Sequence, residues 1–551
     1  MSDTRKPFRS GEKNPGGMQH SAKTSFTKGG MSKKPDGIRK SDGIRTPGDA
    51  RTSYGKPVGK PSFDKAQGRP KGPRPSNTRM SNGTRTPGGN RPNAPRPERR
   101  EERRVSTLTA RRIALDTLLD VTVQDAYASL ALDKRLNAGV HLSERDKRLC
   151  TELVYGTLEN RIRIDYMVDQ FLSDPNIDRI VREVLRMGVY QLFFLDRVPD
   201  MAAVDESVKL TRSMGLESLT GLVNAVLRNM LRRKDEIRLP KPADGAEEYL
   251  SVMFSLPRVL VRRLIDAYGE QEALEIARYR PKTHETTLRI TRGRMSAQEM
   301  EAFLEKQGIP FERGLIEGMY RLSRPGDLAQ SFAYRNGLFS IQGESSVLAA
   351  LAVGARPGMN VLDACAAPGG KTAVLAEEME DAGRILAWDK HEHRVALIRA
   401  MTQRLGFDNV RPAVRDAQVL REELVGTQDA VLIDAPCSGT GVMLSKPDVK
   451  YRVSEASLAE LHETQRAILE TCAAYVRRGG VLVYSTCSIL PEENVQQVRD
   501  FLCAHPEFVL EGLSERLPES VREHVHEGML QLLPHRDHLE GFFIARMVRK
   551  S

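Results

Sequence analysis

The chain has 551 residues, enough for about three or four domains that each bury a core, so it is not a single compact unit. Its net charge is +11, but residues 1–100 carry 24 Lys and Arg against 7 Asp and Glu, or +17, which leaves −6 for the rest. Six scattered cysteines exclude a disulfide scaffold, and no apolar run reaches the roughly 18 residues of a membrane span. Without a signal peptide or a Cys-x-x-Cys pair, we expect a cytoplasmic monomer with no metal site and no membrane partner.

The basic segment at residues 1–104 is predicted to be disordered. Its first 100 residues hold 13 of the 30 prolines and no leucine, so it cannot bury enough apolar surface to offset its chain entropy. Lys and Arg spread among Gly, Pro and Ser are typical of arms that bind RNA phosphates without sequence preference. The alternative interpretation is a tail that only keeps the chain soluble.

Residues 105–237 have a helical pattern that predicts an all-α bundle of five to seven helices. The clearest helix is expected at 180–195, where apolar residues recur at three- and four-residue steps and make a broad buried face. The segments ELVYGTL at 152–158, VLRMGVYQL at 184–192 and VNAVLRN at 223–229 resemble, in this order, the NusB-like RNA-binding domain. This resemblance implies RNA contact, whereas a bundle used only for packing is the alternative.

A linker and a small α+β subdomain are predicted for residues 238–335. Residues 238–255 are rich in Pro, Lys and acids, as a linker would be. After it, helical patterns and short strand candidates alternate in an order that suits a ferredoxin-like subdomain. The helices are expected at 257–280 and 296–307, and the strands at 287–290, 310–313 and 338–341. Three arginines here, Arg289, Arg292 and Arg294, could line an RNA path, although most isolated arginines are solvated surface.

Residues 336–551 alternate strands and helices, which predicts a doubly wound, Rossmann-like α/β domain. Its active edge should lie where the parallel strands end. The strand candidates are 359–363, 384–389, 429–434, 480–485 and 541–548, and helices are expected at 391–405 and 456–476.

A turn of small residues follows the first of these strands and ends in Gly369, Gly370 and Lys371. A Walker loop would need a glycine where this chain has Cys365, so a nucleoside triphosphate site is excluded. The glycines permit a sharp turn and a close ligand, and the helix that follows offers free N–H groups. The next strand ends in Asp389, where Rossmann-like folds bind ribose. These features predict a cofactor site, with a purely structural turn as the alternative.

Two cysteines follow strand ends: Cys437 in DAPCSGTG at 434–441, and Cys487 in YSTCS at 484–488. A single cysteine is usually a small buried hydrophobe. Here both lie at strand ends that should converge on one crevice beside the glycine turn, which predicts a pair of nucleophiles next to a cofactor. The remaining cysteines, Cys150, Cys472 and Cys503, are expected in the core.

These motifs resemble the Sun/Nop family of S-adenosylmethionine-dependent RNA cytosine-5 methyltransferases. The glycine turn, DAPCSGTG, STCS with Glu492-Glu493-Asn494 after it, and GFF at 541–543 recur in order, and the resemblance covers about residues 105–551. With the NusB-like domain in front, it implies methylation of carbon 5 of a cytosine in 16S ribosomal RNA, either free or in an early small-subunit particle. The alternatives are the same reaction on tRNA or another rRNA cytosine, or a non-catalytic RNA-binding assembly factor.

The resemblance also implies a role for each matched residue. Cys487 would be the covalent nucleophile and Cys437 would assist release of the methylated base, which lies near Lys371 and Asp434. The implied ligands of S-adenosyl-L-methionine are Cys365, Ala366, Ala367, Pro368, Gly369, Gly370, Lys371, Asp389, Asp416 and Asp434. For Asp416, the capping of a helix is the alternative.

Two positions depart from the family pattern. The family usually has an aspartate where this chain has Gly343, so any role for an acid there is lost, and no tryptophan follows Pro257. These differences bear on the choice of rRNA site more than on the reaction.

Overall fold

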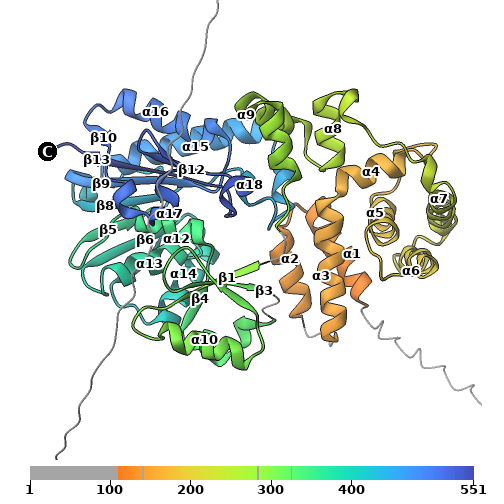
Figure 1. Ribbon diagram of the computed structural model, residues 1–551, viewed down its shortest axis with the longest axis horizontal. Helices are drawn as coiled ribbons and strands as arrows, with labels where there is room; N and C mark the ends of the chain where they lie inside the picture. The colour runs from red at the N-terminus through yellow and green to blue at the C-terminus, as the bar shows by residue number, and fades with distance from the viewer. Residues whose placement is uncertain (1–108, 139–141, 282–284, 324–325) are drawn as a thin grey trace, which may run out of the picture. The chain divides into compact units, whose positions relative to one another are not determined.

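The computed structural model describes residues 109–138, 142–281, 285–323 and 326–551 (Figure 1). The predictions for the basic segment at 1–104 concern residues outside these ranges. None of the helices in the described ranges combines the length and hydropathy needed to cross a bilayer.

The first part of the described chain is the predicted helical bundle. Its seven α-helices are α1 (Ala110–Val123), α2 (Ala128–Leu136), α3 (Glu144–Glu159), α4 (Arg161–Asp169), α5 (Arg179–Phe193), α6 (Asp200–Ser213) and α7 (Thr220–Arg232). α5 is the helix expected at 180–195, and Asp178 caps it by accepting hydrogen bonds from two of its N–H groups, which stabilises such a helix by about 1 kcal/mol. Gly188 lies inside α5 because a Cβ there would approach Ser207 Oγ to 2.9 Å. Close packing against α6 therefore requires a glycine.

Two helices follow the bundle, α8 (Ala246–Met253) and α9 (Arg258–Arg278). The linker predicted for 238–255 is therefore wrong in its second half. The physical reason is that Leu250, within this charged stretch, is buried against α9 and so stabilises a helix.

The small subdomain has the order β1 (Glu285–Ile290), α10 (Ala297–Lys306), β2 (Phe311–Arg313), β3 (Met319–Ser323), α11 (Phe332–Arg335), β4 (Phe339–Ile341). Its sheet order is β2-β3-β1-β4 with every pair antiparallel, which is the ferredoxin-like arrangement that was predicted. β3 was not predicted. Arg289, considered for an RNA path, is buried in an ion pair with Glu377 of the next domain and is a core residue.

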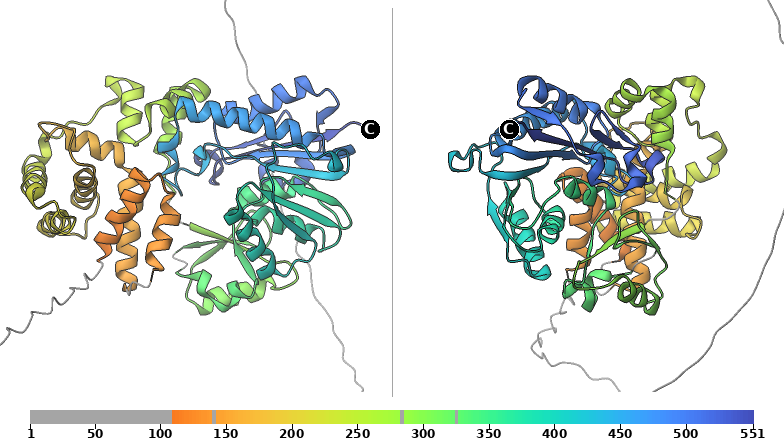
Figure 2. Two further views of the ribbon diagram at one scale, coloured as in Figure 1. Left: turned by 180° about the vertical axis from the view of Figure 1, so that it is seen from behind. Right: turned by 60° about the vertical axis from the view of Figure 1, so that its left-hand side comes forward.

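The last part of the chain is built on a nine-stranded sheet (Figures 1 and 2). The strand order is β11-β12-β13-β9-β8-β5-β6-β7, with β10 paired to β13, and the strands from β9 to β7 are parallel. The strands are β5 (Asn360–Asp363), β6 (Arg384–Asp389), β7 (Val410–Val414), β8 (Gln428–Asp434), β9 (Val476–Thr486), β10 (Phe508–Leu510), β11 (Val525–His526), β12 (Met529–Leu532) and β13 (Phe542–Arg549). The five predicted strands are confirmed, and β7, β10, β11 and β12 were not predicted.

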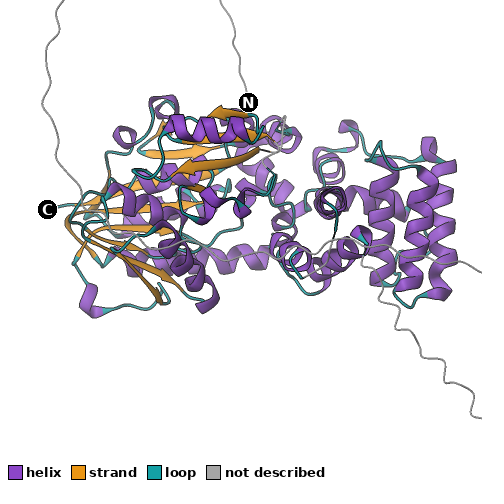
Figure 3. Ribbon diagram, turned by 90° about the horizontal axis from the view of Figure 1, so that it is seen from below, coloured by secondary structure: helices purple, strands orange, loops and turns teal. Residues whose placement is uncertain are grey.

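Helices cover both faces of this sheet, as the doubly wound prediction requires (Figure 3). Val361 contributes to the core on the side of α12, α13 and α14, whereas its neighbour Leu362 packs toward α15 and α16, as expected from the alternation of side chains along a strand. The helices are α12 (Glu344–Leu351), α13 (Gly370–Glu378), α14 (Glu392–Leu405), α15 (Glu455–Ala473), α16 (Val495–Ala504), α17 (Glu519–Arg522) and α18 (Pro534–Asp537).

The register of the sheet brings several loops to one edge. Asp363 pairs with Leu432 across β5 and β8, and Asp434 pairs with Ser485 across β8 and β9, so these strands end together. Because β13 is antiparallel to β9, it begins at the edge where β9 ends, with Phe543 opposite Thr486. The loops after β5, β6, β8 and β9 and the loop before β13 therefore share this edge.

Candidate active site

The glycine turn lies between β5 and α13 and is tied to the neighbouring strands. The Ala364 N–H donates to Leu432 O at 2.9 Å, and the Ala366 N–H donates to Trp388 O at 2.7 Å. Gly369 caps α13 with φ = 110°, and a Cβ there would lie 2.4 Å from Met401 Cε. Only glycine fits this conformation without strain. No side chain caps α13, so its first N–H groups can bind a ligand.

A buried carboxyl group lies directly before this turn. Asp363 ends β5, is inaccessible to solvent, and accepts a hydrogen bond from Thr372 Oγ1 at 2.7 Å through Oδ2. Its other oxygen, Oδ1, is buried without a hydrogen-bond partner. Burial raises the pKa of Asp363 to about 7, because a charge there is poorly solvated. An unpaired polar atom of this kind fits a ligand that brings its own donor.

Two more acids follow the neighbouring strands. Asp389, at the end of β6, is almost fully buried, accepts from the His391 N–H at 3.1 Å and lies 3.3 Å from Arg394 Nε. Asp416, after β7, accepts from the Gln418 N–H and from Lys390 Nζ, each at 3.0 Å. Slight burial would raise the pKa of Asp416, but these donors outweigh burial and lower it. Asp416 shapes a turn and caps no helix, so that alternative is wrong.

Lys371 and Asp434 meet across the edge. Lys371 Nζ lies 2.7 Å from Asp434 Oδ2 and 5.2 Å from the centre of the Phe542 ring. Asp434 Oδ1 also accepts a hydrogen bond from Ser485 Oγ at 3.1 Å. Burial alone would lower the pKa of Lys371, but the charge and the hydrogen bond of Asp434 outweigh burial and raise it. The lysine is therefore a cation at neutral pH.

The two predicted cysteines face each other. Cys437, after β8, and Cys487, after β9, are free thiols with their Sγ atoms 3.3 Å apart. The hydrogen bond with Cys487, burial and the charge of Glu493 hold the pKa of Cys437 well above its ordinary value. Cys437 therefore holds its proton more firmly than an ordinary thiol and can donate an S–H hydrogen bond to the Cys487 sulfur.

Glycines bring the surrounding loops into backbone contact. The Gly441 N–H donates to Cys487 O, and the Gly541 N–H donates to Gly441 O, each at 2.9 Å. A Cβ on Gly441 would lie 2.1 Å from Gly541 O, so no side chain fits between these loops. The DAPCSGTG, STCS and GFF motifs are thus joined at one point.

The structure places the predicted residues of the two cysteine motifs and the glycine turn at one sheet edge, with three further residues beside them. Asp363, Phe542 and Glu493 were parts of the motifs but received no predicted role. The sequence could have indicated Asp363, because it is an acid at a strand end before a glycine turn. The hydrogen-bond partners of Glu493 are visible only in the fold. Of the other cysteines, Cys150 and Cys472 are buried as predicted, but Cys503 is exposed, because the apolar face of α16 is formed by Val498 and Phe501.

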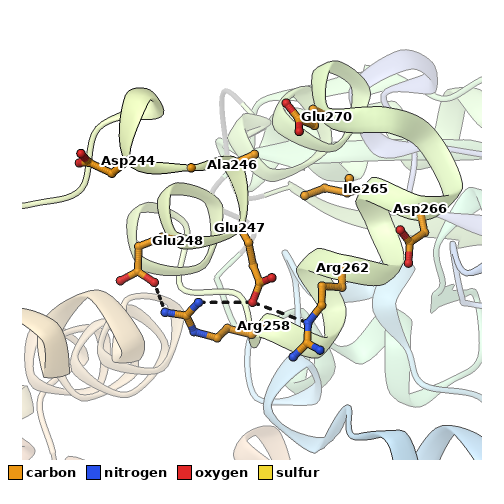
Figure 4. A pocket seen from close by; sticks show the side chains of 10 residues that line it. Asp244, Ala246, Glu247, Glu248, Arg258, Arg262, Ile265, Asp266 and Glu270 are labelled. Carbon is orange, nitrogen blue, oxygen red and sulfur yellow. Dashed lines mark hydrogen bonds and ion pairs between the residues drawn. The ribbon is translucent and has the colours of Figure 1, made fainter.

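A surface cavity of about 440 Å³ lies elsewhere, beside α8 and α9 (Figure 4). Arg258 and Arg262, which line it, already pair with Glu247, and Arg258 also pairs with Glu248. The other charged lining residues are acidic, so the cavity disfavours a phosphate-bearing ligand. It contains none of the predicted site residues.

Two family models and several curated relatives match the chain. A model of the family described as 16S rRNA methyltransferase RsmB/F matches residues 350–548, and a model of the NusB family matches residues 108–232. The chain is 38% identical over 447 residues to the probable ribosomal RNA small subunit methyltransferase B of Bacillus subtilis (strain 168), covering 80% of this chain and 99% of that protein. It is 32% identical over 450 residues to ribosomal RNA small subunit methyltransferase B of Shewanella oneidensis, covering 81% and 100%.

A solved structure shares the architecture. PH0851 superposes with a TM-score of 0.69 at 26% identity and covers 80% of this chain and 99% of its own. The predicted NusB-like bundle and Rossmann-like methyltransferase domain are confirmed by these matches, and so is the use of S-adenosylmethionine. The chain belongs to the 16S rRNA methyltransferase RsmB/F family.

Proposed function

We propose that this protein methylates carbon 5 of a cytosine in 16S ribosomal RNA through a covalent bond between Cys487 and the base. The observation that carries the proposal is the pair of thiols, Cys437 and Cys487, with 3.3 Å between their sulfur atoms at the edge that holds the glycine turn. The names of the relatives, which are small subunit rRNA methyltransferases, support the substrate. In this proposal residues 105–237 contact RNA, residues 238–335 connect and support, and residues 336–551 perform the chemistry.

The residues of the glycine turn fit the methyl donor. S-adenosylmethionine supplies an electrophilic methyl group on a sulfonium. The unpaired Oδ1 of Asp363 and the free N–H groups of α13 suit the amino and carboxylate groups of its methionine part. Asp389, Asp416 and the 365–371 turn complete the proposed cofactor site, in which Asp389 accepts from ribose hydroxyls.

The chemistry needs a nucleophile because carbon 5 of cytosine is too weakly nucleophilic to take a methyl group unaided. The Cys487 thiolate adds to carbon 6, which forms an S–C bond and moves the C5=C6 electron pair onto carbon 5. Carbon 5 then takes the methyl group as the bond between that methyl group and the sulfonium sulfur breaks, which leaves a neutral thioether. Loss of the proton on carbon 5 to a water molecule restores the double bond and breaks the C6–S bond, which returns the thiolate.

The neighbouring groups prepare the base for this addition. Lys371 is held as a cation by Asp434, and in this proposal its N–H groups bind the cytosine ring and draw electron density away from carbon 6. The Phe542 ring beside Lys371 offers a flat apolar surface to the base. The target cytosine must leave its stack, or lie in a loop, to reach this edge.

Methyl transfer to defined RNA tests the proposal. The full-length protein is mixed with S-adenosylmethionine labelled in its methyl group and with unmodified 16S rRNA, either free or in immature small subunits. We expect label in 5-methylcytosine at one position. No label in cytosine would contradict the proposal, whereas label in tRNA or another rRNA alone would keep the reaction and change the substrate.

A further inference from the structure

A buried carboxylate connects the two cysteine loops. Glu493 is inaccessible to solvent and accepts four hydrogen bonds, two at each oxygen. Oε1 accepts from the Ser438 N–H at 2.8 Å and from Gln465 Nε2 at 3.0 Å. Oε2 accepts from the hydroxyl groups of Ser438 and Ser488. Ser438 directly follows Cys437, and Ser488 directly follows Cys487.

This environment differs from that of the other buried glutamates in the described chain. Glu183 and Glu344 each pair with an arginine. Glu493 forms no ion pair with any described residue, and its partners are neutral donors. Burying a carboxylate without a cation is unfavourable, because hydrogen bonds only partly replace its hydration. Its negative charge therefore acts on the nearest groups, and one of these is the Cys437 thiol.

The residue that follows Glu493 fixes the Cys487 loop on both sides of the cysteine. Asn494 Oδ1 accepts from Thr486 Oγ1 at 2.6 Å, and Asn494 Nδ2 donates to Ser488 O at 2.9 Å. Tyr484 also donates its hydroxyl hydrogen to Glu493 O at 2.8 Å. The backbone around Cys487 is therefore held by the same short segment that supplies the carboxylate.

We propose that Glu493 is a positioning residue that joins Ser438 to Ser488, sets the separation of the two sulfur atoms, and places a negative charge beside Cys437. The carboxylate touches neither substrate nor cofactor. It disfavours a negative charge on Cys437, which therefore keeps its proton and can donate a hydrogen bond to the Cys487 sulfur. The catalytic meaning of this arrangement rests on the proposed function, but the arrangement itself does not.

Alkylation of the thiols tests the inference without RNA or methyl donor. The full-length protein and its Glu493→Gln variant are treated with iodoacetamide between about pH 6 and pH 10, and mass spectrometry follows Cys437 and Cys487 separately. We expect the rise of Cys437 alkylation with pH to occur about one pH unit or more lower in the variant than in the unmodified protein, because the adjacent negative charge is gone. Glu492→Gln is the matched control, since Glu492 lies on the same turn and pairs with Arg263. Its profile should equal that of the unmodified protein.

Kinetics separate positioning from loss of structure. Glu493→Gln should lower kcat about tenfold or more with KM for RNA changed less than about threefold. Glu493→Asp keeps the charge but shortens the side chain, so its alkylation profile should stay near that of the unmodified protein while kcat falls. Ser488→Ala removes one donor and no charge, and provides a readout if the Glu493 variants fail to fold.

Identical alkylation profiles for Glu493→Gln, Glu493→Asp and the unmodified protein would overturn the inference. If the unmodified protein methylates no cytosine but the Cys437 profile moves as expected, the proposed function fails and the inference about the thiol pair stands.

Discussion

Lys371 Nζ lies 2.7 Å from Asp434 Oδ2, and the two side chains come from the first turn of α13 and the end of β8, separated by 63 positions in the chain. The pair is mostly shielded from solvent, with side-chain exposures of 12% and 27%. Removal of either residue would therefore leave its partner as a poorly solvated ion.

Removal of the Lys371 cation should abolish most of the methyl-transfer activity. We expect Lys371→Met to lower kcat for methyl transfer about 100-fold or more and to reduce the free energy of unfolding by about 1–3 kcal/mol, since Asp434 loses its partner. Steady-state kinetics and thermal unfolding measure both effects. Lys209→Met is the control, because Lys209 forms an exposed pair with Glu206 and should leave activity and stability nearly unchanged. Equal activity in the two variants would exclude a role for Lys371.

The alanine variants of the two cysteines should differ in whether a covalent protein–RNA intermediate accumulates. With RNA and S-adenosylmethionine, Cys437→Ala should accumulate a covalent protein–RNA adduct on a denaturing gel, because the base is methylated but released slowly. Cys487→Ala should form no adduct, since it lacks the nucleophile. The exposed thiol Cys503 supplies the control, and Cys503→Ala should turn over normally. The opposite pattern would exchange the two roles.

The buried carboxyl of Asp363 should make the stability of the unliganded protein depend on pH. Its pKa is about 7 in the folded chain against an ordinary 3.8, so between these values the folded state holds a proton that the unfolded state has lost. Raising the pH through this window therefore lowers the free energy of unfolding, by about 2–4 kcal/mol in total.

Asp363→Asn should remove this dependence. The variant should unfold at a higher temperature than the unmodified protein at pH 8, but not at pH 4, and should bind S-adenosylmethionine more weakly by about tenfold. Calorimetric unfolding and titration of the methyl donor measure the two properties. A variant that is less stable at pH 8 would show that the charged carboxylate is tolerated in the fold.

A substitution at Gly343 tests how the protein has adapted to a glycine at a position where the family usually has an aspartate. A Cβ at this position would lie 2.9 Å from Glu540 Oε2, so the Glu540 carboxylate occupies the space that a side chain at 343 would use. Gly343→Asp should bring two carboxylates together and reduce the free energy of unfolding by about 1–3 kcal/mol at pH 8. Gly343→Asp combined with Glu540→Gln should recover part of the loss. No recovery would show that the clash, rather than the charge, is responsible.

Much of the fold follows from local patterns, and the missed parts depend on distant partners. The strands β5, β6, β8 and β9 are apolar runs that a parallel sheet requires. By contrast, β7 includes Pro412, and β10 and β11 have only three and two residues, so none of these produces a clear period. Arg289 is a charged residue of the kind that usually lies on the surface, but it is buried beside its partner Glu377, which lies 88 positions away in the chain. Local sequence cannot show such a pair.

The site was predicted to the extent that strand ends converge in a parallel sheet. This rule brings Cys437 and Cys487 together, but it gives neither the distance between their sulfur atoms nor the charge that lies beside Cys437. Those depend on Glu493, whose bonds to Ser438 span 55 positions. The motif contained the carboxylate, and only the fold shows what it binds.

The contact between Gly441 and Gly541 limits how this sequence can vary. Every substitution at either position adds a side chain, and there is no room for one between the two loops. Neither position can be rescued by a change at the other, because each added Cβ would meet backbone atoms of the opposite glycine, and a Cβ on Gly541 would also meet Ile489 Cγ2. In a library of all single substitutions, these two positions should be as intolerant as the cysteines themselves, although neither glycine takes part in the reaction.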